Sequence, residues 1–165
     1  MNYKIGDTVV HWTHGIGSVI AIEEVQLAGT AQWCYVVEVG ILKLWVAVDD
    51  ACKGSIRFPM ERSQFQGMLA ILRQPGQPLP ERYTQRKMAL RARMQKRTLA
   101  ELCQVIRDLT ERSRHHTLTA DDASDLSSAE EHLLDEWVIS LSTERAEAQR
   151  ELEMLLQYDS SGIRD

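Results

Sequence analysis

The stretch 79–97, LPERYTQRKMALRARMQKR, decides how the remainder of the chain is interpreted. It holds seven of the nineteen Lys and Arg residues and a single acid, Glu81, in a chain of formal net charge -5. Pro80 suits the first turn of a helix, and no further Pro or Gly interrupts the stretch. Four arginines recur at helical spacing along one stripe: Arg82, Arg86, Arg93 and Arg97. The sequence therefore predicts a basic helix.

Two interpretations of this helix are open from its residues alone. An arginine-lined face with an aromatic residue, Tyr83, near its start is suited to lie against a phosphate backbone. Alternatively, Leu79, Tyr83, Leu90 and Met94 form an apolar stripe that buries the tyrosine and leaves the charges in solvent. Composition alone favours the second interpretation, because runs of charge are usually solvated faces.

Composition limits the classes of protein that this chain can belong to. Its 165 residues are enough for one ordinary domain or two small ones, and 44% hydrophobic residues can form a core. No apolar run approaches the roughly 20 residues of a membrane span, and the N-terminus lacks a signal sequence, so we expect a cytoplasmic protein. Because the chain is acidic overall, any contact with DNA must come from a local basic patch.

Residues 1–58 have the pattern of short strands. Residues rich in β-branched and aromatic side chains alternate with glycine-containing turns, and the predicted strands are 7–12, 17–25, 33–39 and 43–48. Four short strands with tight turns form an antiparallel meander. We expect it to curl into a small Tudor-like or SH3-like β-barrel whose edge strands remain available for pairing. The Gly15-Ile-Gly17 pair lacks the remaining elements of a phosphate loop, so it predicts a tight turn.

Residues 62–158 have the pattern of helices. Prolines and a glycine at 74–80 interrupt the pattern, forming a stiff connector before the basic helix. Ser63 with Gln66 and Thr98 with Glu101 resemble capping boxes, and further helices are expected to open near Thr119 and Thr143. Apolar residues repeat at helical spacing through each segment. The predicted class is α+β, a β-barrel followed by an all-α bundle of about five helices, with a loose tail at 159–165.

The sequence offers few groups for catalysis or metal binding. Cys34, Cys52 and Cys103 are odd in number and lack C-x-x-C spacing, so they predict buried thiols rather than disulfides or a zinc site. His115 and His116 are adjacent and do not share a helix face, which makes a poor metal site. We expect no metal, no cofactor and no enzymatic activity, and favour a binding role.

Four stretches carry a resemblance to a known family. They are Lys4 to Val10 with His14-Gly15, Leu72-Arg73-x-Pro75, Val105 to Leu109, and Leu118-Thr119-Ala120. In this order and spacing the chain resembles the CarD/CdnL family of bacterial RNA polymerase-binding transcription regulators, from about Tyr3 to Leu156. The N-terminal part of that family is similar to the polymerase-interacting domain of transcription-repair coupling factors.

The resemblance implies a role for the basic helix. Family members contact promoter DNA at the upstream edge of the melted bubble, where a Trp near the start of this helix enters the minor groove and stabilises the open complex. Tyr83 stands at that position here. The residues implied to bind DNA are Arg82, Tyr83, Arg86, Lys87 and Arg91. Basic residues that the family carries on a later helix are replaced by Ala123, Ser124 and Ser128.

The resemblance also implies a polymerase-binding surface on the barrel, which in the family binds the polymerase β subunit. The residues that correspond to it are Val25, Leu27, Trp45 and Ala47. Family arginines fall near Val25 and Ala47, so this surface is expected to be more apolar here. The implied function is that of a monomeric, non-enzymatic regulator that binds RNA polymerase and promoter DNA, away from membranes. The alternative is a protein-only adaptor that uses the barrel edge without touching DNA.

Overall fold

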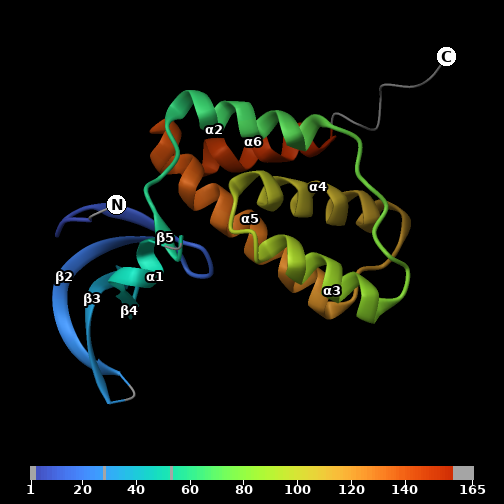
Figure 1. Cartoon of the computed structure of the whole chain (residues 1–165). Helices are drawn as coiled ribbons and strands as arrows, with labels where there is room; N and C mark the ends of the chain where they lie inside the picture. The colour runs from blue at the N-terminus through green and yellow to red at the C-terminus, as the bar shows by residue number, and fades with distance from the viewer. Residues whose placement is uncertain (1–2, 28, 53, 158–165) are drawn as a thin grey trace. The chain divides into compact units, whose positions relative to one another are not determined.

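The chain folds as two compact units, Met1–Pro59 and Met60–Asp165. The computed structural model describes residues 3–27, 29–52 and 54–157 (Figure 1). The side chains of Leu27, Asp50 and Cys52 lie outside the described part, and so does the predicted tail at 159–165.

The first unit is an antiparallel sheet, as the sequence predicted, but it has five strands in place of the four expected. Its strands run in the order β4-β3-β2-β1-β5, and the sheet curls strongly along β2 and β3 (Figure 1). Their bounds are β1 Thr8–His11, β2 Gly15–Leu27, β3 Thr30–Val39, β4 Leu42–Ala47 and β5 Ile56–Arg57. The sheet order ends at β4 and β5, so the sheet is open. Both edge strands therefore carry backbone groups that the sheet itself leaves unpaired.

A short helix that the sequence did not predict completes this unit. Helix α1, Val48–Cys52, follows β4 directly and adds Ala51 to the buried core, with Val48 packed against it. The other buried members are Tyr3, Val9, Val19, Tyr35, Val37, Val46 and Ile56. The short helix therefore packs against the core beside the edge strand β4.

The turn between β1 and β2 explains the predicted glycine pair. His11 pairs with Gly15 across the turn, and Gly15 has a φ of 80°, which favours glycine. A Cβ on Gly17 would lie 2.5 Å from the backbone oxygen of Glu38, so the close approach of β3 excludes any side chain there. The prediction of a tight turn is confirmed.

Within residues 60–157, the second unit contains five α-helices, which agrees with the predicted number. They are α2 Arg62–Leu69, α3 Tyr83–Met94, α4 Leu99–His115, α5 Ala120–Leu141 and α6 Arg145–Gln157, with a 3-10 turn, η1 Ala70–Arg73, after α2. Each helix contributes to one core, in which Phe65, Leu72, Ile106, Leu133 and Trp137 are among the buried side chains. Helical spacing in the sequence had predicted these inward-facing residues.

Two of the predicted N-caps are present in the structure, and the one predicted at Ser63 is not. Thr98 and Thr119 are N-caps, and their hydroxyls accept from the backbone N–H groups of Glu101 at 3.3 Å and Asp122 at 3.2 Å, as expected. The cap predicted at Ser63 is wrong, because α2 begins at Arg62 with Glu61 as N-cap. Thr143 lies just before α6, and its hydroxyl donates to Glu147 at 2.8 Å.

A buried carboxylate fixes the connector that leads into α3. Asp108 on α4 accepts the backbone N–H of Gln77 at 2.8 Å and also binds Arg93 at 2.5 Å and Arg107 at 2.8 Å. The carboxylate is thus shared by two cations and one backbone donor, which satisfies its charge away from water. At Gly76 a Cβ would lie 2.4 Å from the Cβ of Glu111, so only glycine lets the connector pass this close to α4.

Candidate functional site

The start of α3 is set by the buried guanidinium of Arg86. The helix begins at Tyr83, with Arg82 as an extended N-cap, and therefore later than Pro80 had suggested. Arg86 Nη1 donates to the backbone oxygens of Pro80 at 3.0 Å and Glu81 at 2.9 Å. These two carbonyls precede the helix, so a side chain rather than the helix itself satisfies them. The entry of the chain into α3 is therefore fixed.

The predicted role of Arg86 in phosphate contact needs correction. Its side chain is only 3% exposed, and Nε and Nη2 each lie 2.9 Å from Oδ2 of Asp122, at the start of α5. Burial raises the pKa of Asp122, but the hydrogen bonds from Arg86 and Thr119 outweigh it and lower the pKa overall. An arginine whose donors already bind a buried carboxylate and two carbonyls has little to offer a phosphate.

Two members of the predicted arginine stripe, Arg86 and Arg93, therefore face the interior of the helical unit, whereas Arg82 and Arg97 are exposed. Arg93, two turns after Arg86, binds the buried Asp108. Leu79 and Leu90 are buried beside it, and Met94 is half-buried against the core. The stripe thus combines apolar packing with ion pairs to α4 and α5, and it gives Arg86 and Arg93 a structural rather than a DNA-facing role.

A second stripe of α3 is exposed and contains the aromatic residue. Tyr83, Lys87 and Arg91 are spaced by four residues and all are exposed, Tyr83 to 41%. The interpretation that Tyr83 is buried with Leu90 and Met94 is wrong. Among the described residues, neither Arg82 nor Arg91 has a salt-bridge partner. We call Tyr83, Lys87 and Arg91 the exposed stripe.

An acid on α5 lies against the exposed stripe. Oδ2 of Asp121 is 2.5 Å from Lys87 Nζ and accepts the Tyr83 hydroxyl at 2.5 Å. Lys87 Nζ also donates to the Tyr83 hydroxyl at 3.1 Å and lies 5.6 Å from the centre of its ring. The hydrogen bond to Asp121 raises the pKa of Lys87, and the same bond lowers the pKa of Asp121, so both remain charged at neutral pH.

Sequence reasoning missed Asp121. Asp121 lies in the first turn of α5, where it contacts Lys87 of α3. The two residues of the Lys87–Asp121 pair are 34 positions apart, so no local spacing predicts it. Asp121 and Asp122 are neighbours, yet one is at the surface and the other is buried.

Strand register brings the predicted polymerase-binding residues onto one face of the sheet. Trp45 pairs with Val36, Ala47 pairs with Cys34, and Val25 pairs with Gln32. Paired residues share a face, and alternate residues of one strand do so too. Val25, Trp45 and Ala47 therefore lie on the same face, which we call the outer sheet face. Leu27 ends β2, and its side chain lies outside the described part.

The two tryptophans of β3 and β4 lie on opposite faces of the sheet. Trp45 on the outer sheet face is 50% exposed, although Cys34 and Val36 beside it are buried. Trp33 follows the alternation of Tyr35 and Val37 on the core side, but it lies at the far end of β3 and is 58% exposed. Neither tryptophan is therefore a core residue.

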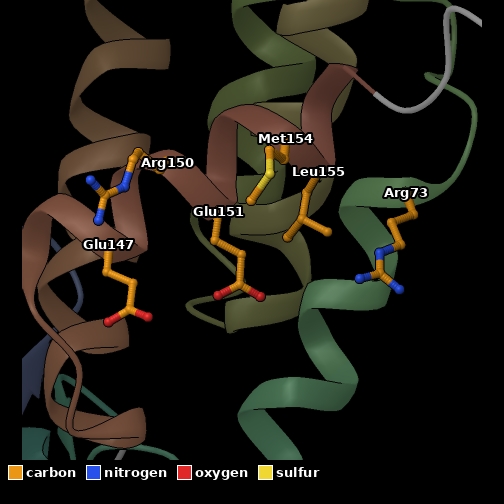
Figure 2. Close-up of a pocket in the computed structure, with 6 residues that line it drawn as sticks. All are labelled: Arg73, Glu147, Arg150, Glu151, Met154 and Leu155. Atoms are coloured by element: carbon orange, nitrogen blue, oxygen red, sulfur yellow. The ribbon is translucent and has the colours of Figure 1, made fainter.

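A pocket in the helical unit has a mixed lining. It lies between η1 and α6, and its lining residues are Arg73, Glu147, Arg150, Glu151, Met154 and Leu155 (Figure 2). Two cations and two acids surround it, so it does not present a surface of one sign to a phosphate chain. Among the described residues, no group of three His, Cys, Asp or Glu side chains is placed to hold a metal ion.

Cys34 and Cys103 are buried, as the sequence predicted. Burial, with a contribution from Glu136, raises the pKa of Cys103 to about 12, which suppresses the thiolate form needed of a nucleophile. In the part of the chain that the structure describes, no helix has the length and apolar character needed to cross a membrane.

Two family models match this chain, one in each unit. Residues 3–57 match the CarD-like/TRCF RID domain, which covers the sheet unit. Residues 67–153 match the C-terminal domain of CarD, which includes α3 and the first turn of α5. The two matches follow the division of the chain into units, and the second alone spans more than half of its length.

Proposed function

Because the chain belongs to the CarD family of RNA polymerase-interacting transcription regulators, we propose that it binds the polymerase β subunit and stabilises open promoter complexes by contacting DNA. Members of this family are non-enzymatic regulators, and the proposal assigns no catalysis to the chain. The DNA contact is assigned to Arg82 and the exposed stripe, and the polymerase contact to the outer sheet face.

The proposed DNA contact rests mainly on the exposure of Tyr83. A large aromatic ring, 41% exposed at the first residue of a basic helix, with a cation one turn and two turns further on, suits insertion beside a phosphate backbone. Lys87 and Arg91 then supply charge on the same side of the helix. Unstacking a base step from the minor groove costs a few kcal/mol, so insertion of the Tyr83 ring is most favourable where the duplex is already melting.

The polymerase part is supported by the composition of the outer sheet face. Trp45 is large and half-exposed, and its neighbours on the same face include the apolar Val36 and the small Ala47 as well as Lys43, which suits an interface anchor. Because the sheet is open, its edge strand β4, which contains Trp45, can also pair through its backbone with an extended segment of the partner.

The test is the lifetime of open promoter complexes formed by the cognate polymerase. Wild-type protein should lengthen it, Tyr83→Ala should abolish most of that effect, and Tyr83→Trp should extend it by offering more stacking area. Met88→Ala is the matched control, because Met88 is exposed on α3 away from the exposed stripe. Tyr83→Ala should change the free energy of unfolding by only about 0.5 kcal/mol, since the ring is not in the core.

The alternative function makes a different forecast. A protein-only adaptor would bind polymerase in a pull-down with Tyr83→Ala and with wild type alike, and neither protein would change the open-complex lifetime. An unchanged lifetime with intact polymerase binding would therefore refute the DNA part alone.

A further inference from the structure

We propose that Asp121 is a built-in competitor of DNA phosphate for Lys87, which lowers the affinity of the protein for ordinary duplex DNA. This inference rests on the proposed DNA contact and assigns a specificity-determining residue to it. The carboxylate already occupies the place beside Lys87 Nζ that a phosphate oxygen would take, at 2.5 Å. For Lys87 to neutralise a phosphate, it must first release Asp121.

The position of the pair at the surface makes this exchange feasible. The Lys87 and Asp121 side chains are 55% and 47% exposed, and an exposed ion pair contributes only ~0–1 kcal/mol, which solvent and salt reduce further. By contrast, the neighbouring Arg86–Asp122 pair is buried and cannot be opened cheaply. Lys87 can thus change partners without disturbing the attachment of α3 to α5.

Competition by Asp121 acts in two ways. While Lys87 is paired internally, it neutralises no phosphate and releases none of the counterions condensed on the DNA, so it adds nothing to the salt dependence of binding. In addition, Asp121 keeps a negative charge beside Lys87, one helical turn from Arg91, where it repels DNA phosphates. Both effects oppose binding to any duplex, whereas the aromatic contact of Tyr83 is available only at a distorted step. The predicted result is a bias toward melted promoter DNA over ordinary duplex.

The variant Asp121→Asn isolates this charge. Asparagine keeps an oxygen that can accept the Tyr83 hydroxyl, so the ring retains its support while Lys87 loses its ionic partner. Asp125→Asn is the matched control, because it removes one charge from the next turn of α5. Among the described residues, Asp125 makes no hydrogen bond to Lys87, although its charge is felt there. Both changes are at exposed positions, so both variants should fold.

The measurement is fluorescence anisotropy of the full chain on a labelled duplex without promoter sequence, titrated at several salt concentrations. Asp121→Asn should tighten binding by about eightfold at ~0.1 M salt and steepen the salt slope by about 0.9, the contribution of one phosphate. Asp125→Asn should tighten binding by less than half of that factor with an unchanged slope. In a Lys87→Met background, Asp121→Asn should have no more effect than Asp125→Asn.

The outcomes separate this inference from the proposed function. If Arg91→Gln weakens binding but Asp121→Asn matches wild type, the competition is refuted and the DNA contact stands. Equal gains from Asp121→Asn with and without Lys87 would reduce the effect to net charge and overturn the inference. If neither wild type nor Asp121→Asn binds the duplex in a salt-dependent way, both the DNA contact and the inference fail.

Discussion

Arg86 and Tyr83 lie one helical turn apart on α3, yet Arg86 is buried on a carboxylate while Tyr83 reaches solvent. The difference comes from the neighbouring helices. Asp122 on α5 and Asp108 on α4 are buried and bind the arginines that face them, Arg86 and Arg93. Lys87 of the exposed stripe instead pairs with Asp121, which is accessible to solvent. A basic helix therefore presents to a partner only the cations that its own fold does not neutralise.

The largest expected effect tests the buried side of this comparison. Arg86→Ala should lower the free energy of unfolding of the helical unit by about 3–5 kcal/mol, because it leaves the Asp122 carboxylate buried without its cation. Urea denaturation monitored by circular dichroism measures this loss. Arg91→Ala on the exposed stripe is the control, and it should change stability by no more than about 0.5 kcal/mol. Similar losses for the two variants would contradict the assignment.

The pH dependence gives an independent check on the same pair. Folding lowers the pKa of Asp122, so its contribution to stability is complete above the ordinary value of 3.8 and is lost as the pH falls through the lower folded value. The difference in unfolding free energy between wild type and Asp122→Asn should be constant from about pH 5 to 7 and shrink in stronger acid.

The fold was largely predictable because its signals are local. Helical spacing identified Phe65, Ile106 and Leu133 as inward-facing, and Thr98 and Thr119 marked two helix starts correctly. The short helix α1 was missed because Val48 to Cys52 continues directly from a strand without a cap or a breaker. Its placement depends on the core that it covers rather than on its own residues.

The candidate site was predictable only in part, because its charges are assigned by tertiary contacts. The sequence grouped Arg86 with Arg82 by spacing, but spacing cannot reveal the carboxylate of Asp122, 36 residues away, that holds it. The motif Val105 to Leu109, which helped to reveal the family, is buried throughout. Its Arg107 and Asp108 support the connector into α3. Residues that identify a family can thus position a site without forming its surface.

The next largest effect is expected for Trp45, an exposed residue of the sheet unit. Trp45→Ala should weaken polymerase binding by about 2 kcal/mol, roughly 30-fold, as expected for the loss of an interface anchor. Its half-exposed position predicts that the unit stays folded. Trp33→Ala is the matched control, because it removes a similarly exposed tryptophan from the opposite face. Equal losses of polymerase binding in surface plasmon resonance would refute the outer sheet face as the contact.

A smaller effect is expected for the unpaired cations. Arg91→Gln should weaken binding to any duplex by about eightfold at ~0.1 M salt and reduce the salt slope by about one unit, since one phosphate contact is lost. Arg82→Gln should behave in the same way. Arg93→Gln serves as the contrast, because its guanidinium is held by Asp108 and should add nothing to the slope. A reduced slope for Arg93→Gln would mean that the inner stripe also reaches DNA.

The smallest effect separates the ring of Tyr83 from its hydroxyl. Tyr83→Phe removes the hydrogen bond to Asp121 and the one from Lys87, but both partners are exposed and remain paired with each other. The free energy of unfolding should therefore change by no more than about 0.5 kcal/mol. Because unstacked bases pack against the ring and not the hydroxyl, the open-complex lifetime should stay close to that of wild type, whereas Tyr83→Ala shortens it. A lifetime as short for Phe as for Ala would show that the hydroxyl and its link to Asp121, rather than the aromatic surface, make the contact with DNA.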